Sequence, residues 1–135
     1  MGINDLETKA YNLDDFIKCC GDNTRKVIIY NDAQLNARIQ FGLNTEVELL
    51  MFIGNGGLQD LDYINTEPWR NNPRKNVEVL IDAYTFRSNS KMGYIAFMKT
   101  YNDNYAIKSF HLDNNKITTR ELGSNSNKLT LKEGL

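Results

Sequence analysis

Residues 76–113 read NVEVLIDAYTFRSNSKMGYIAFMKTYNDNYAIKSFHLD, and this stretch decides the fold. It holds three apolar runs rich in β-branched and aromatic residues, a pattern typical of strands. The expected strands are residues 77–86, 93–101 and 104–112. The joints between them, 87–92 and 102–103, are short and rich in turn-forming residues. Short joints connect antiparallel neighbours, so the stretch predicts a three-stranded meander whose last strand carries His111, the only histidine.

Helical patterns come before this meander. The expected helices are residues 12–20, 32–41 and 45–53. Their expected N-caps are Asn12, Asp32 and Thr45, and the first two helices should stop at Gly21 and Gly42. The short run KVIIY at 26–30 predicts an extended segment between the first two helices. The second and third helices are expected to pack against one face of the sheet, with the mostly apolar third helix deep in the core.

The region 58–75 is irregular and contains both prolines of the chain. We expect a loop here, with one helical turn at 59–64 and with Trp69 packing the loop down. Residues 114–135 are polar and are expected to form a loosely ordered tail, with 128–132 as a candidate added strand. The sequence therefore predicts a single α+β domain over residues 1–113, with N-terminal helices packed on a three- to four-stranded antiparallel sheet.

Length and composition limit the classes of function. The chain has 135 residues, enough for one domain with a hydrophobic core. Its net charge of -1 argues against broad phosphate neutralisation but allows a local basic patch. The adjacent Cys19 and Cys20 suit neither a disulfide framework nor a zinc site. No apolar run approaches the ~20 residues of a membrane span, and residues 1–10 lack an apolar signal core, so we expect a cytoplasmic protein. We also expect that it needs no cofactor.

The short turn 102–103 sets the register of the second hairpin. Paired residue numbers then sum to 205, whether the turn has two residues or four. Tyr94 is thereby expected opposite His111, within about 5.5 Å between backbone carbons and on the face not covered by the helices. Alternation of side chains along the strands adds Ser109 and Tyr105 to the same face.

These side chains can support RNA cleavage. Ribonucleases that use the 2′-hydroxyl as nucleophile need a proton acceptor for it, a proton donor for the leaving 5′-oxygen and positive charge near the phosphate. His111 suits the donor role, and Tyr94 suits the orientation of the phosphate. The expected RNA-binding residues are Arg87, Lys91, Ser109, Tyr84, Arg70 and Arg74. The structural alternative is an ordinary cross-strand pair with no catalytic role.

Several short motifs follow one another in order between residues 11 and 113. They are AQLNA at 33–37, FGL at 41–43, the apolar helix 46–53, DYIN at 62–65, DAY at 82–84, YIA at 94–96 and SFH at 109–111. In this order and spacing the chain resembles the MqsR-type toxins, within the RelE/barnase/EndoU group of small ribonucleases. The resemblance implies metal-independent cleavage of single-stranded RNA by a toxin that a cognate antitoxin neutralises.

Carried onto this sequence, the family's strand tyrosine is Tyr94 and its last-strand lysine is His111. Two other positions depart from the family pattern. The loop lysine is replaced by Asn65, and the polar residue before the Asp-Val-Tyr motif is replaced by Ile81. These departures remove a cation and a polar group, which puts activity of the family type in doubt.

Two functions from different classes stay open on the sequence. An endoribonuclease toxin is favoured by the expected Tyr94–His111 pair and by the ordered resemblance. A catalytically inert immunity or anti-defence protein of a mobile element, acting by protein–protein binding, is favoured by the near-neutral charge and by the two departures. A metal-dependent enzyme has less support, because the aspartates at turns and strand ends, Asp82, Asp103 and Asp113, show no ligand spacing.

Overall fold

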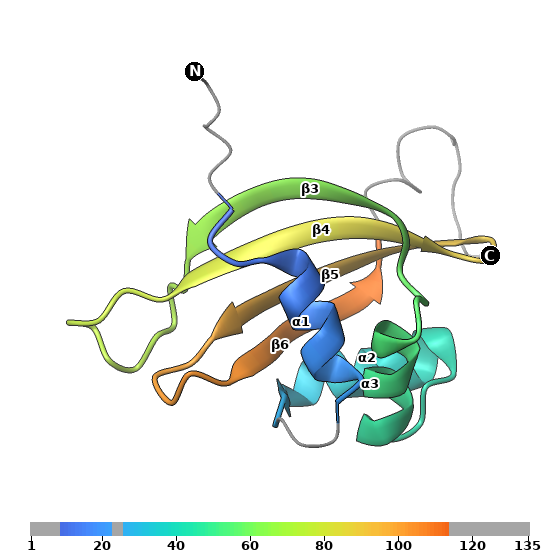
Figure 1. Ribbon diagram of the computed structural model, residues 1–135, viewed down its shortest axis with the longest axis horizontal. Helices are drawn as coiled ribbons and strands as arrows, with labels where there is room; N and C mark the ends of the chain where they lie inside the picture. Colours follow the sequence, from blue (N-terminus) through green and yellow to red (C-terminus); the bar gives the residue numbers. More distant parts are fainter. Residues whose placement is uncertain (1–8, 23–25, 114–135) are drawn as a thin grey trace.

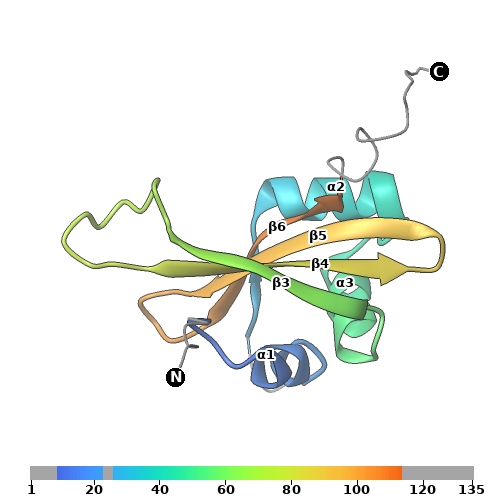
Figure 2. The same ribbon diagram turned by 90° about the horizontal axis from the view of Figure 1, so that it is seen from above.

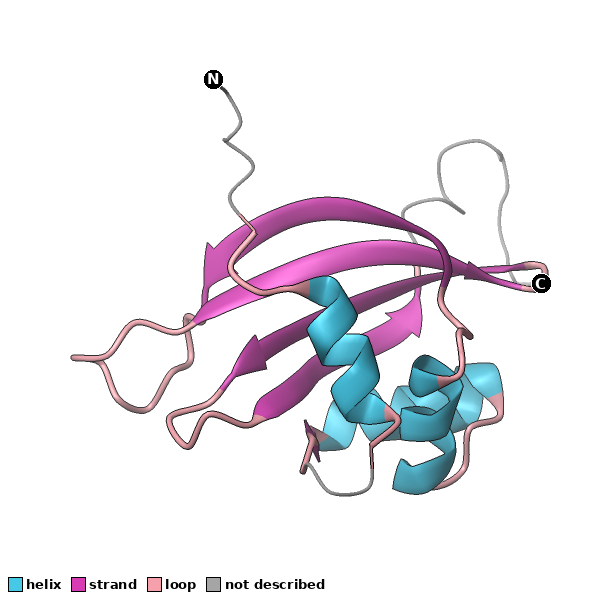
Figure 3. Cartoon of the chain, in the orientation of Figure 1, coloured by secondary structure: helices cyan, strands magenta, loops and turns pink. Residues whose placement is uncertain are grey.

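The fold is α+β, as the sequence predicts, in a computed structural model that describes residues 9–22 and 26–113 (Figure 1). Within these residues the helices are α1 (Leu13–Cys20), α2 (Asn31–Phe41) and α3 (Glu46–Gly54). The strands are β2 (Ile28–Ile29), β3 (Gln59–Pro68), β4 (Leu80–Ser88), β5 (Lys91–Lys99) and β6 (Tyr105–Leu112). Figure 3 shows α1 below the middle of the arched strands and α2 and α3 toward the end where β4 turns into β5. The expected tail 114–135, with its candidate strand 128–132, lies outside the described residues.

The sheet among the described residues has five strands in the order β2-β6-β5-β4-β3. The predicted meander is confirmed as β4, β5 and β6, which pair antiparallel. The prediction of a three- to four-stranded antiparallel sheet is wrong in two respects, because β2 and β3 extend it at both edges and β2 runs parallel to β6. The chain path permits the parallel pairing, since α2, α3 and three strands between β2 and β6 provide the long connection that parallel strands need.

The predicted helical turn at 59–64 is wrong, and the predicted loop 58–75 is confirmed only from residue 69 onward, because Gln59–Pro68 forms strand β3. β3 is an edge strand, and two register shifts interrupt its pairing with β4. Only a few of its side chains, among them Leu61 and Tyr63, pack against the core. A mostly exposed, bulged edge strand lacks the apolar alternation that identifies strands in a sequence.

The helices and one face of the sheet enclose the main core. Phe16 of α1 stacks on Phe97 of β5 with ring centroids 3.8 Å apart, and Phe41 of α2 meets Phe110 of β6 at 4.9 Å. From α3, Leu49 and Ile53 are fully buried. Figure 2 shows α1 and α2 on opposite sides of the view from above, with α2 lying along β6.

Two of the three predicted N-caps are confirmed. The Asn12 side chain accepts from Asp15 N, and the Thr45 side chain accepts from Glu48 N. Asp32 is not the cap of α2, which begins one residue earlier after Tyr30 without a side-chain cap. The third helix is also less deeply buried than expected, because Val47 keeps 66% of its surface exposed.

The pairing of β5 with β6 near their turn differs by one residue from the predicted pairing. A bulge in β6 restores the predicted register farther along the strands. Near the turn Lys99 pairs with Tyr105, so the residue numbers sum to 204, and a register shift then restores the sum of 205 at Ala96. The extra residue on β6 is Lys108. Tyr105 consequently faces the main core, contrary to the expectation that it shares a face with His111.

Candidate functional site on the outer sheet face

The face of the sheet opposite the main core, here called the outer face, carries Thr85, Tyr94, Ala96, Ser109 and His111. Its assignment follows from alternation along the strands. Ile95 and Phe110 belong to the main core, so their neighbours Tyr94 and His111 point the other way. Thr85 is opposite Tyr94, and Ser109 is opposite Ala96.

The predicted pairing of Tyr94 with His111 is confirmed. The two residues are direct partners of β5 and β6, and their rings stack with centroids 4.9 Å apart and an interplanar angle of 14°. Nδ1 of His111 lies 2.6 Å from the Leu112 carbonyl oxygen. Because a carbonyl oxygen only accepts, Nδ1 must carry a proton, and Nε2 is left to act on a ligand.

Two carboxylates lie in the electrostatic environment of Tyr94. Burial raises the pKa of its hydroxyl above the ordinary value of 10.0, and the charges of Glu67 and then Asp113 raise this pKa further. Tyr94 is therefore a neutral hydroxyl at physiological pH, suited to donating a hydrogen bond. Glu67 gives no signal in the sequence, because it lies in a stretch that is predicted as a loop and is in fact strand β3. The position of Asp113, two residues after His111, is the signal in the sequence that could have identified it.

The expected RNA-binding residues are divided between the two faces. Ser109 and Arg87 lie on the outer face, where Arg87 comes two residues after Thr85 and forms an exposed ion pair with Asp60. Lys91 lies on the other side, where its ammonium group donates to the Gln40 carbonyl oxygen of α2. Tyr84 is 2% exposed within the main core, so neither Tyr84 nor Lys91 is brought to the Tyr94–His111 pair.

Arg70 and Arg74 lie in the loop 69–79, beyond the end of the sheet to which β5 runs (Figure 1). Both are exposed, and the Arg74 guanidinium lies 4.2 Å from the centroid of the Tyr101 ring. They belong to a region distinct from the Tyr94–His111 pair.

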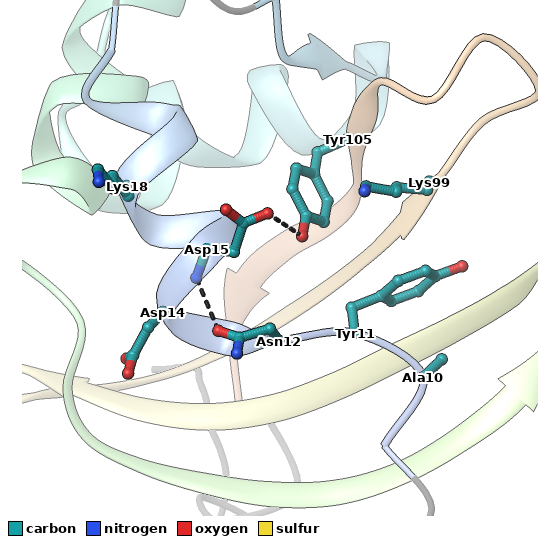
Figure 4. Close-up of a pocket in the computed structure, with 8 residues that line it drawn as sticks. All are labelled: Ala10, Tyr11, Asn12, Asp14, Asp15, Lys18, Lys99 and Tyr105. Carbon is teal, nitrogen blue, oxygen red and sulfur yellow. Dashed lines mark hydrogen bonds between the residues drawn. The ribbon is translucent and has the colours of Figure 1, made fainter.

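A pocket of about 510 Å³ lies between the start of α1 and the ends of β5 and β6 (Figure 4). Inside it Tyr105 donates to the Asp15 carboxylate at 2.8 Å, and Lys99 lies over the Tyr105 ring. Figure 4 shows Asp15 and Tyr105 pointing toward each other. These contacts join α1 to the sheet, and we assign the pocket no catalytic role.

Other kinds of site find no support in the described part of the chain. No three His, Cys, Asp or Glu side chains there are grouped so that they could hold a metal ion. None of the helices in residues 9–22 and 26–113 is long and apolar enough to cross a membrane. No protein-family model, curated protein or solved structure matches the chain. Function must therefore be argued from the chemistry of the outer face itself.

Proposed function

We propose that the chain is a metal-independent endoribonuclease of the toxin type, which cleaves single-stranded RNA on the outer face and is neutralised by a protein antitoxin. The observation that carries the proposal is the stacked Tyr94–His111 pair. Its histidine is oriented by the hydrogen bond to the Leu112 carbonyl, and its Nε2 atom makes no hydrogen bond within the described residues.

The reaction is an internal transfer of the phosphodiester. The 2′-hydroxyl gives its proton to water, its oxygen attacks the phosphorus, and the bond to the 5′-oxygen breaks. His111, protonated on both nitrogens, donates the Nε2 proton to the leaving oxygen. The Tyr94 hydroxyl donates a hydrogen bond to the phosphate, and Arg87 offsets the charge of the transition state. The products are a 2′,3′-cyclic phosphate and a 5′-hydroxyl.

Arg87 can take this role because its present ion pair is weak. The Arg87 and Asp60 side chains are 50% and 64% exposed, and ion pairs of this kind contribute at most about 1 kcal/mol. A phosphate can therefore displace Asp60 at little cost.

Replacing His111 tests the proposal directly. His111→Ala should lower cleavage of single-stranded RNA about 10²-fold or more, the usual effect of losing a general acid. The assay uses purified protein with excess chelator and follows the cyclic phosphate. DNA should not be cut, because it lacks the nucleophile. Equal rates for the wild type and His111→Ala would indicate a contaminating nuclease and sink the assignment.

Arg87 and Lys91 form a matched pair of variants for the same assay. Each is an exposed cation near the turn between β4 and β5, but only Arg87 lies on the outer face. Arg87→Gln should lower the rate about tenfold, the effect of about 1.4 kcal/mol of lost transition-state stabilisation. Lys91→Gln should leave the rate unchanged. Circular dichroism checks that both variants are folded.

One observation favours the second candidate, an inert protein that acts by binding another protein. Glu67 and Asp113 bring negative charge toward Tyr94, whereas the expected cation Lys91 is held on the other side of the sheet. Such a surface suits a partly basic protein partner better than a phosphate. Absence of cleavage across a range of RNA sequences, with and without ribosomes, would favour this candidate.

A further inference from the structure

The loop 69–79 between β3 and β4 is a local basic patch. Its three basic residues, Arg70, Arg74 and Lys75, are exposed and outnumber its one acidic residue, Glu78. None of the ion pairs formed among the described residues involves these three cations. The patch therefore carries uncompensated positive charge in a chain whose net charge is -1.

Hydrogen bonds within the loop give it a defined shape. The Asn72 side chain, 5% exposed, donates to the Val77 carbonyl at 2.6 Å and accepts from Arg74 N at 3.0 Å. The Lys75 ammonium donates to the Arg70 carbonyl at 3.0 Å. A cavity of about 320 Å³ lies within this loop, and its walls include Trp69, Asn72, the cation Lys75 and the carboxylate Glu78. This volume lies at the lower end of the range for small-molecule sites, about 300 to 1,000 Å³, and suits a ligand the size of one nucleotide.

Aromatic rings connect this loop to the outer face. Trp69, the only tryptophan, packs against a second cluster on that face, formed by Val79, Met98 and Ala106. Its indole meets the Tyr30 ring edge-on at 6.1 Å. Trp69 and Tyr30 thus pack over a buried apolar cluster that connects the loop to the outer side of the sheet.

Two buried polar atoms in this region have no hydrogen-bond partner within the described residues. They are Nε1 of Trp69 and the hydroxyl oxygen of Tyr101. Buried donors nearly always have an acceptor in proteins. Both atoms have almost no exposed surface, so an acceptor from outside the chain reaches them only if neighbouring side chains move.

We propose that the loop 69–79 is a nucleotide subsite of the RNA-binding surface, where an unpaired base stacks on Trp69 while Arg70 and Lys75 contact the adjoining phosphates. Single-stranded RNA is bound by this combination of aromatic stacking and positive charge. The inference rests on the proposed function. Met98 comes four residues after Tyr94 on β5, about 13 Å away at 3.3 Å per residue, so the bound base lies several nucleotides from the cleaved bond.

The test separates binding from cleavage by using single-stranded RNA hexamers with 2′-O-methyl groups, in which the nucleophile is blocked. Because Trp69 is the only tryptophan, its fluorescence reports on the subsite. The hexamer should quench it with saturation. Trp69→Ala should weaken binding of a labelled hexamer about tenfold or more, measured by fluorescence anisotropy. Trp69→Phe, which keeps an aromatic ring and guards against misfolding, should retain most of the affinity.

Charge variants provide a second measurement. Arg70→Gln and Lys75→Gln should each reduce the slope of log affinity against log salt by about 0.7, the contribution of one phosphate contact with a single strand. Arg38→Gln is the matched control, because Arg38 is an exposed cation on α2, away from the loop. Unchanged slopes for both loop variants would overturn the assignment of phosphate contacts.

The outcomes distinguish this inference from the proposed function. Quenching by the hexamer without cleavage of natural RNA supports the subsite and overturns the proposed function. Cleavage with unchanged tryptophan fluorescence overturns the subsite alone, and absence of both overturns the two together. A mononucleotide that binds as tightly as the hexamer would overturn the extended RNA path.

Discussion

A single buried carboxylate connects the N-terminal segment to the sheet. Asp82 has no exposed surface and lies on the core side of β4. One oxygen accepts from Ala10 N and the Thr66 hydroxyl, and the other accepts from Tyr11 N at 2.9 Å. Hydrogen bonds to a charged group contribute about 1.5 to 3 kcal/mol each, and the donors would be left without acceptors if the carboxylate were removed.

Asp82→Ala should therefore lower the free energy of unfolding by about 3 kcal/mol or more, measured by urea denaturation. Thr66→Val removes one of the three donors and should cost about 1 kcal/mol. If the two variants were equally stable, the two backbone donors, Ala10 N and Tyr11 N, would not depend on Asp82. The buried role of Asp82 could not be predicted from the sequence, because nothing along the chain connects it to residues 10 and 11.

The Cys20 thiol makes the free energy of unfolding depend on pH in the alkaline range. Burial, and secondarily the charge of Cys19, raises the pKa of its thiol from 9.0 to about 12. The folded state thus holds this proton more tightly than the unfolded state. The contribution of the protonated Cys20 thiol to the free energy of unfolding is complete below pH 9. It is lost as pH rises toward 12, by at most about 1.4 kcal/mol per pH unit.

Cys20→Ala should make the free energy of unfolding less dependent on pH between 9 and 11. The measurement is urea denaturation at several pH values with a reducing agent present. The tyrosines titrate in both proteins, so the difference between the two curves isolates the thiol. Parallel curves would show that Cys20 ionises equally easily in the folded and unfolded chains.

At the scale of single elements, the sequence predicted best where hydrophobic alternation was strong. β4, β5 and β6 bury one face in the core, so alternation identified them, and the Tyr94–His111 register followed. The predicted turn was nevertheless wrong by one residue, and the bulge at Lys108 compensates for it. A bulge arises from packing against neighbouring elements and leaves no clear mark on the local sequence.

β3 shows why part of the candidate site could not be predicted. Its exposed polar residues resemble a loop, and only its pairing with β4 makes it a strand. Glu67, whose charge raises the pKa of Tyr94, lies on this strand and could not be placed from the sequence. On this strand the Asn65 side chain donates a hydrogen bond to the Glu67 carboxylate.

At the scale of the whole molecule, two different elements, β2 and α2, cover the edge of β6 that faces away from β5. β2 pairs only with Ala106 and Ile107, and α2 lies beside the rest of the strand. There the Gln40 side chain accepts from Leu112 N at 2.7 Å. Covering an edge strand in this way removes a site for unwanted pairing with other chains. The sequence could not predict this arrangement, because it joins segments about 70 residues apart.

The helices themselves meet through two glycines, which leads to the last prediction. A Cβ atom on Gly54 of α3 would lie 2.5 Å from the Gly21 Cα and 2.7 Å from Gly21 N, at the end of α1. Backbone atoms cannot rotate away as side chains can, so Gly54→Ala must push α1 and α3 apart. It should lower the free energy of unfolding by about 1 to 3 kcal/mol, as overpacking usually does.

The decisive result is whether Gly54→Ala lowers or raises the free energy of unfolding, because a change from glycine to alanine in a helix ordinarily stabilises by about 1 kcal/mol. Gly56→Ala is the control: an added Cβ meets nothing within 4 Å, and only its φ of +88° opposes the change. Stabilisation by Gly54→Ala in urea denaturation would contradict the close approach of the two helices. Since α1 and α3 contribute to the main core and not to the outer face, the folded Gly54→Ala protein should bind RNA as the wild type does.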